Sequence, residues 1–118
     1  MAHSNENLLN PETQMCINDC FDCHSTCLET IAYCLKKGGE YAEESHIFLL
    51  QDCSEICEAS GNFTIRGSDF YEKVCEMCVE ICEACAIDCD KFKDDLPMKA
   101  CAIACWRCAD SCRLMAGV

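Results

Sequence analysis

The chain has 118 residues, sixteen of them cysteine, and a formal net charge of −12. This length fits one domain over residues 1–118, and so acidic a chain is unsuited to nucleic acid, whose phosphates would repel it. No apolar run is long enough to span a membrane, and the first residues lack the basic and apolar regions of a secretion signal. We therefore expect a cytoplasmic protein, in which thiols stay reduced unless they are catalytic or bind metal.

The positions of proline, glycine and capping residues divide the chain into helices. Four helices are predicted, over residues 12–37, 41–60, 69–92 and 97–115. We expect Gly61 to end the second helix, and Ser68 or Asp69 to cap the third with Glu72 completing a capping box. Short connections favour antiparallel neighbours, so the predicted fold is all-α, an antiparallel up-down-up-down four-helix bundle.

The predicted helices carry their cysteines on one stripe. In the third helix, five cysteines follow one another at steps of three and four residues: Cys75, Cys78, Cys82, Cys85 and Cys89. These steps place them on the face that a helix turns to the core. The remaining core-facing cysteines are Cys16, Cys20, Cys23, Cys27, Cys34, Cys53, Cys57, Cys101, Cys105, Cys108 and Cys112. The bundle is therefore predicted to have a cysteine-lined core.

A buried row of thiols points to a soft metal, because thiolates select Cu(I), zinc and iron–sulfur clusters. Cu(I) accepts two or three sulfurs, and two cysteines one helical turn apart supply a two-sulfur site. If neighbouring sites share sulfurs, the load approaches one Cu(I) per thiol. Each ion replaces a thiol proton, which leaves the core near neutral. We therefore predict multiple Cu(I) ions per monomer, and storage rather than an enzyme.

Other uses of the cysteines fit the pattern less well. Neighbouring thiols on one helix stripe have parallel Cα–Cβ directions, which suit a disulfide framework badly. A zinc or mixed soft-metal sequestering protein is the alternative metal interpretation, although zinc sites usually take paired cysteines from turns. A thiol redox protein using one C-x-x-C pair would need a thioredoxin-like frame. The segment from Cys20 to His24 matches the haem c signature C-x-x-C-H, but haem attachment takes place outside the cytosol.

The cysteine rows make the chain resemble the bacterial copper storage proteins, cysteine-rich four-helix bundles that hold Cu(I) inside. The resemblance covers about residues 12–115. Its most specific motif is C-x3-C-x2-C-x3-C at Cys16–Cys27, Cys78–Cys89 and Cys101–Cys112, with C-x3-C at Cys53 and Cys57. The resemblance implies multiple cuprous ions per bundle, a homotetramer, no catalytic turnover, and copper donors or acceptors as partners. The lack of a signal peptide is similar to the cytosolic branch of the family.

Three positions depart from that family. His46 stands where a further cysteine is expected, and Phe92 and Ala100 stand where the family tends to carry histidines. In an antiparallel bundle, one end would gather Cys34, His46, Cys89, Met98 and Cys101. Thioether, imidazole and thiolate together suit Cu(I), so His46 and Met98 are candidate ligands at the end where copper enters.

The opposite end is predicted to gather Cys16, Cys57, Cys75 and Cys112. Tyr71 would close the bundle there, and Met115 would be either a plug or a weak ligand. His24 lies off the cysteine stripe and is expected to face outward. Apolar residues off the stripe, including Phe48 and Trp106, are more than one small bundle can bury, which favours an oligomer.

Overall fold

The computed structural model describes residues 10–117, beginning with the N-cap of the first long helix, α2 (Pro11–Lys37). The side chain of Asn10 accepts hydrogen bonds from two backbone N–H groups of the first turn, at 2.8 and 3.4 Å. The helix ends at Gly38, whose positive φ of 72° suits glycine and whose N–H donates to the carbonyl of Cys34. Both ends of α2 are therefore set by local sequence.

The second long helix, α3 (Glu44–Arg66), follows a short 3-10 helix, η1 (Gly39–Ala42). The prediction that this helix ends before Gly61 is wrong, because the glycine lies inside it. A Cβ added to Gly61 would stand 2.8 Å from Cζ of Phe21 on α2. The glycine thus allows a close approach of α3 to α2, and the helix continues until Gly67 adopts the left-handed conformation at φ 65°.

The third long helix, α4 (Tyr71–Asp90), begins without the predicted capping box. No side chain caps its first turn, so neither Ser68 nor Asp69 acts as its N-cap and Glu72 has no capping partner. The hydroxyl of Ser68 instead accepts a hydrogen bond from the backbone of Phe70 at 3.1 Å. Ser68 therefore shapes the turn that precedes α4 rather than the helix itself.

The last helix, α5 (Leu96–Ala116), begins at a side-chain cap. Oδ1 of Asp95 accepts a hydrogen bond from the backbone N–H of Met98 at 3.0 Å, and a proline follows as the second helical residue. At the other end, Gly117 adopts the left-handed conformation at φ 72°. The tight turn before α5 brings α4 and α5 together as antiparallel neighbours.

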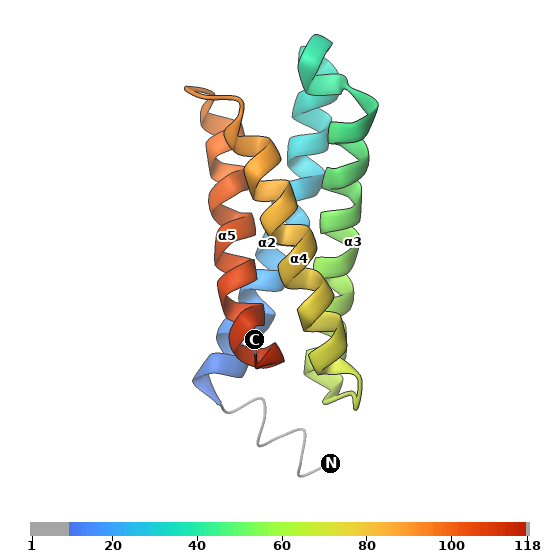
Figure 1. Cartoon of the computed structure of the whole chain (residues 1–118), viewed down its shortest axis with the longest axis vertical. Coiled ribbons are helices and arrows are strands. Elements are labelled where there is room, and N and C mark those ends of the chain that lie inside the picture. Colours follow the sequence, from blue (N-terminus) through green and yellow to red (C-terminus); the bar gives the residue numbers. More distant parts are fainter. Residues whose placement is uncertain (1–9, 118) are drawn as a thin grey trace.

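The four long helices form an antiparallel up-down-up-down bundle, which confirms the predicted fold class (Figure 1). α2 and α4 lie diagonally, and each packs against both α3 and α5. The bundle measures 50 × 21 × 21 Å. We call the upper end in Figure 1, where α2 and α4 end, the His46 end, and the lower end, where α5 finishes, the Met115 end. Among the described helices, none combines the length and the apolar character needed to cross a membrane.

Sulfur fills the core of this bundle. All sixteen cysteines are buried with at most 1% of their surface exposed, and all are free thiols. Small neighbours such as Ala86, Ala102 and Ala109 surround them, and Leu50 on α3 is the largest fully buried side chain. The predicted cysteine-lined core is therefore present, without any disulfide among the sixteen residues.

Candidate metal centre

Sulfur atoms from all four long helices form one continuous network through the middle of the core. Neighbouring Sγ atoms are 3.5–3.9 Å apart among Cys16, Cys20, Cys23, Cys53, Cys57, Cys78, Cys82, Cys105, Cys108 and Cys112. With metal–sulfur bonds of about 2.3 Å, as for zinc, two sulfurs on one metal stand about 4.6 Å apart in a linear site and about 4.0 Å apart in a trigonal one. A tetrahedral metal with the same bonds holds its sulfurs about 3.8 Å apart, so the sulfurs stand close to the spacing of both trigonal and tetrahedral ligands.

Cys57 has three close sulfur neighbours in this network. Its Sγ atom is 3.5 Å from that of Cys82, 3.6 Å from that of Cys108 and 3.9 Å from that of Cys78. These four sulfurs, from α3, α4 and α5, all lie within 4.8 Å of one another. Similar groups of four recur along the axis and share members, as in Cys20/Cys78/Cys108/Cys112, Cys23/Cys53/Cys57/Cys82, Cys23/Cys27/Cys53/Cys105 and Cys27/Cys85/Cys101/Cys105. Shared sulfurs are what bridged metal sites require.

Hydrogen bonds between thiols distribute the protons unequally along the row. Cys108 donates to Cys20 at 3.7 Å, and this contact lowers the pKa of Cys20 to about 6. In contrast, the pKa of Cys16 is raised, chiefly by its contact with Cys112. The contacts between thiols therefore favour loss of a proton at some positions of the row over others.

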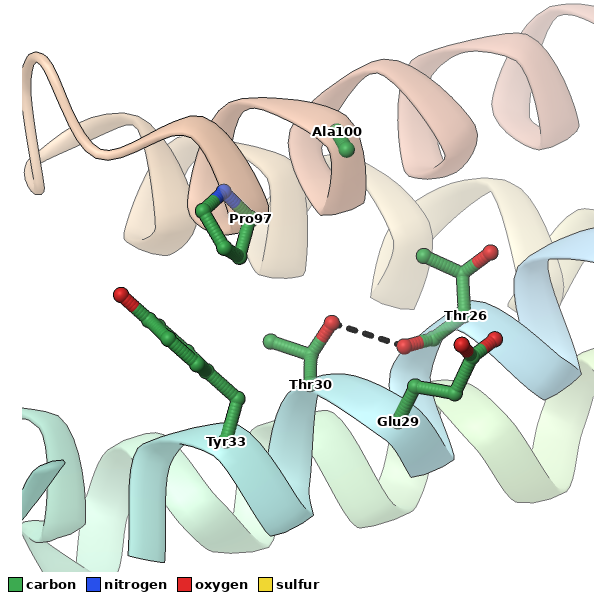
Figure 2. Close-up of a pocket in the computed structure, with 6 residues that line it drawn as sticks. All are labelled: Thr26, Glu29, Thr30, Tyr33, Pro97 and Ala100. Carbon is green, nitrogen blue, oxygen red and sulfur yellow. Dashed lines mark hydrogen bonds between the residues drawn. The ribbon is translucent and has the colours of Figure 1, made fainter. Parts of the chain in front are cut away.

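The thiol row of α2 is interrupted at Thr30, which is buried between Cys27 and Cys34. Its hydroxyl donates to the backbone carbonyl of Thr26 at 2.7 Å (Figure 2). Outside it, a surface groove of about 400 Å³ is lined by Thr26, Glu29, Thr30, Tyr33, Pro97 and Ala100. The groove offers hydroxyl and carboxylate oxygens but neither sulfur nor imidazole, so its donors do not suit a soft metal.

The His46 end brings together three different donors. Sγ of Cys34 lies 3.5 Å from Nε2 of His46 and 3.6 Å from Sδ of Met98, and all three side chains are buried. Burial, together with the nearby charges of Cys101 and Asp95, raises the pKa of Cys34 to about 11. The predicted gathering of thiol, imidazole and thioether is present.

The remaining predicted members of the His46 end are Cys89 and Cys101. Contact with Cys101, and after it with Cys85, raises the pKa of Cys89, so these thiols adjoin one another. The ring of Phe92 covers the imidazole of His46, with 5.0 Å between the ring centroids. The ring of Tyr41 stacks on Phe92, with 4.4 Å between their centroids. Aromatic rings therefore shield this end of the row from water.

Asp95 links the connection between α2 and α3 to the connection between α4 and α5 at the His46 end. No pattern in the sequence indicates this contact. One carboxylate oxygen accepts hydrogen bonds from the hydroxyls of Tyr33, at 2.6 Å, and Tyr41, at 2.9 Å. The contact with Asp95 raises the pKa of Tyr33 to about 12. Because Tyr33 lies on α2 and Tyr41 on η1, one carboxylate fastens both to the start of α5.

At the Met115 end, Cys16, Cys75 and Cys112 come together as predicted, but Cys57 does not join them. Cys75 is 3.4 Å from the hydroxyl of Ser60 and 3.8 Å from that of Thr64, and Ser60 also lies 3.7 Å from Cys112. Cys57 does not meet Cys75, because Ser60 follows it by one helical turn and occupies that level. The last thiols of the row therefore have hydroxyl neighbours on α3.

Tyr71 and Met115 lie with Thr13 and Thr64 around a small space at the same end. The hydroxyl of Thr13 donates to Sδ of Met115 at 3.8 Å. The thioether of Met115 thus already has a partner outside the thiol row. These contacts agree with a plug.

His24 does not face outward as predicted. Its Nδ1 atom lies 2.9 Å from both the hydroxyl and the carbonyl oxygen of Ser54, and its Nε2 atom is 3.7 Å from Glu58. The side chain packs across α3, while Cys20 and Cys23 of the same C-x-x-C-H segment point into the core. The segment is therefore a packing contact between α2 and α3, with no resemblance to an exposed haem attachment site.

Comparison with known proteins shows which proteins this chain is similar to. Residues 9–117 match the family model described as copper storage protein. The cysteine-rich protein YhjQ of Bacillus subtilis strain 168 is 35% identical over 104 residues, which are 88% of this chain and 95% of that protein.

Three solved structures share the fold. The Nmul_A1745 protein of Nitrosospira multiformis has a TM-score of 0.85 and 42% identity, with 90% of this chain and 95% of that chain covered. Cu(I)-bound copper storage protein BsCsp3 has a TM-score of 0.82 and 34% identity, covering 89% and 98%. Apo-Csp3 from Bacillus subtilis has a TM-score of 0.78 and 35% identity, covering 88% and 98%. With a family match that spans every cysteine of the four rows, the chain belongs to the copper storage protein family.

Proposed function

We propose that this protein stores Cu(I), holding many ions on the cysteine thiolates inside the bundle. The observation that carries the proposal is the shared-sulfur geometry: sixteen buried free thiols, with neighbouring sulfurs 3.5–3.9 Å apart through the middle of the row. The Cu(I)-bound relative BsCsp3, with the same fold, supports the choice of metal. Storage would serve copper sequestration, detoxification or supply to copper enzymes.

Charge balance favours Cu(I) over zinc in this core. One Cu(I) per thiolate leaves no net charge, because each ion replaces one proton. If each zinc ion took four thiolates of its own, the sixteen thiolates would bind about four zinc ions. About eight negative charges would then remain uncompensated. Buried charge of that size is very costly, so zinc is the weaker assignment.

The ligands we propose are the sixteen cysteines together with His46 and Met98. At the His46 end, Cys34, His46 and Met98 offer a thiolate, an imidazole and a thioether within reach of one ion. This mixed donor set is weaker for Cu(I) than an all-thiolate set, since thiolate is the softest of the three ligands. We infer that copper enters and leaves at this end.

Catalytic turnover is not part of the proposal. A thiol redox protein needs a reactive cysteine that is partly exposed, with its pKa lowered. Every cysteine of the C-x-x-C pairs in this chain is buried, including Cys20 with Cys23 and Cys105 with Cys108. A substrate disulfide therefore has no access to these sulfurs in the folded bundle.

We also propose a homotetramer in the cytoplasm, which exchanges copper with donor and acceptor proteins. Large apolar side chains on the outside support self-association, among them Leu28 at 50% exposure, Phe48 at 54% and Ile87 at 62%. Sedimentation of the metal-free and copper-loaded forms measures the assembly. A monomer under both conditions would refute this part of the proposal.

Anaerobic titration with Cu(I) against a chromophoric chelator tests storage directly. We expect more than about ten Cu(I) ions per monomer, because nearly every thiol contributes a ligand. A parallel titration with zinc is the control. A load of about one to four Cu(I) ions would contradict bulk storage, and displacement of Cu(I) by equal amounts of zinc would favour the zinc alternative.

A further inference from the structure

The two ring nitrogens of His46 have different neighbours. Nδ1 lies 2.5 Å from Oδ2 of Asp88 on α4, whereas Nε2 lies 3.5 Å from Sγ of Cys34 on α2. The side chain of His46 is 1% exposed, so water does not compete for either nitrogen. An imidazole that donates Nδ1–H to a carboxylate keeps the lone pair of Nε2 free for a metal.

Asp88 is itself held in place. Its second oxygen, Oδ1, lies 2.9 Å from Nζ of Lys91, the residue that caps the end of α4. Each carboxylate oxygen therefore has one partner, and Oδ2 is left for His46. On another side the ring of Phe92 contacts the imidazole at 5.0 Å, which limits rotation of the ring.

We propose that Asp88 is a positioning residue for copper binding at the His46 end. It fixes His46 in the tautomer with Nδ1 protonated and directs Nε2 toward the position between Cys34 and Met98. On binding, Cu(I) would replace the thiol proton of Cys34, which is released to solvent, and accept the lone pair of Nε2, with no change in oxidation state. The inference rests on the proposed function. Loss of such an outer partner typically weakens metal binding by about 10–100-fold.

Three variants separate positioning from a general effect of charge. Asp88→Leu removes the acceptor, and Asp88→Asn removes the charge but keeps one acceptor oxygen. Asp90→Asn is the matched control, because Asp90 is an exposed carboxylate on the same helix. The hydrogen bond that the structure gives its side chain is with the indole N–H of Trp106, at 3.4 Å. A positioning role predicts a graded loss, with Asp88→Asn between Asp88→Leu and the unchanged protein.

The first measurement needs no copper. Long-range proton–nitrogen NMR of metal-free protein labelled with nitrogen-15 histidine reports which ring nitrogen carries the proton, and His46→Gln assigns the signal. We expect the Nδ1-protonated tautomer in the unchanged protein and in Asp90→Asn, with loss of that preference in Asp88→Leu. A His46 ring protonated only on Nε2 in the unchanged protein would overturn the inference.

The second measurement follows the Nε2 signal of His46 at chelator-buffered concentrations of free Cu(I). The concentration that half-shifts the signal should rise about 10–100-fold in Asp88→Leu and less in Asp88→Asn. It should stay unchanged in Asp90→Asn. An equal midpoint in Asp88→Leu and the unchanged protein overturns the inference.

Total copper is measured on the same samples, which separates the role of Asp88 from copper storage itself. A full copper load with a His46 signal that never shifts overturns the role of Asp88 and leaves storage standing. A load of only a few ions overturns storage itself, while the tautomer measured on metal-free protein still tests the contact between Asp88 and His46.

Discussion

Replacing Cys57 by alanine removes a sulfur that has three close sulfur neighbours. In the metal-free protein, loss of an atom about the size of a methylene costs about 0.8 kcal/mol in burial. The cavity of roughly 20–25 Å³ adds about 0.5–0.6 kcal/mol at 24 cal/mol per Å³. Alanine is the better helix former by up to about 0.7 kcal/mol, which offsets part of the loss. We therefore expect a net decrease of about 1 kcal/mol in the free energy of unfolding.

The copper-loaded protein should lose more. Because Cys57 lies within 3.9 Å of Cys78, Cys82 and Cys108, its removal deprives neighbouring ions of a shared ligand. We expect the load to fall by about one to two ions, and each ion held at 100 times its Kd contributes about 2.7 kcal/mol. The loaded form should therefore lose about 4–6 kcal/mol, against about 1 kcal/mol for the metal-free form.

Urea unfolding of both forms, together with anaerobic Cu(I) titration, measures these differences. Leu50→Ala is the matched control, because Leu50 is fully buried on the same face of α3 but offers no ligand. It should cost about 2–5 kcal/mol in both forms and leave the copper load unchanged. Equal losses in both forms of Cys57→Ala, with an unchanged load, would show that Cys57 is only core filler. A fall of many ions would show that the row binds copper as one cooperative cluster.

Two further variants test the packing that holds the row. Gly61→Leu should destabilise the metal-free protein by about 1–3 kcal/mol in urea unfolding, because the ring of Phe21 occupies the space its side chain needs. The exposed neighbour substitution Asn62→Leu should change little, and equal effects of both would contradict the close approach. Asp95→Ala should cost about 2 kcal/mol, since it removes the cap of α5 and the acceptor of both tyrosine hydroxyls. A melting temperature equal to that of the unchanged protein would refute a fastening role for Asp95.

The fold and the thiol row could be predicted because one residue type marked the core face of every helix. Steps of three and four between cysteines survive in sequence wherever a helix keeps one face buried. The pattern also located the interruption at Thr30 and the donors at His46 and Met98, which stand on the same stripe. The spacing of residues along a helix therefore shows which of them lie on the same face.

Periodicity does not record which residue on a neighbouring helix stands opposite. The sequence alone does not settle the role of Gly61, because glycine serves both helix ends and close helix packing, and only Phe21, forty positions earlier, decides between them. Nothing in the sequence distinguishes Asp88, because it is one of 21 acidic residues and its partner His46 lies 42 positions away. The level of Cys57 in the bundle depends on the axial offset between α3 and α4, which no spacing within one helix records.

The donors of the row are spaced for metal before any metal arrives. Helices closed by caps at Asn10 and Asp95 hold neighbouring sulfurs 3.5–3.9 Å apart, so the entropy of gathering the ligands is lost when the chain folds. Binding an ion then requires proton exchange and small side-chain rotations instead of backbone ordering. Release of an ion likewise requires no unfolding, which suits a protein that stores Cu(I) and gives it up while the bundle stays folded.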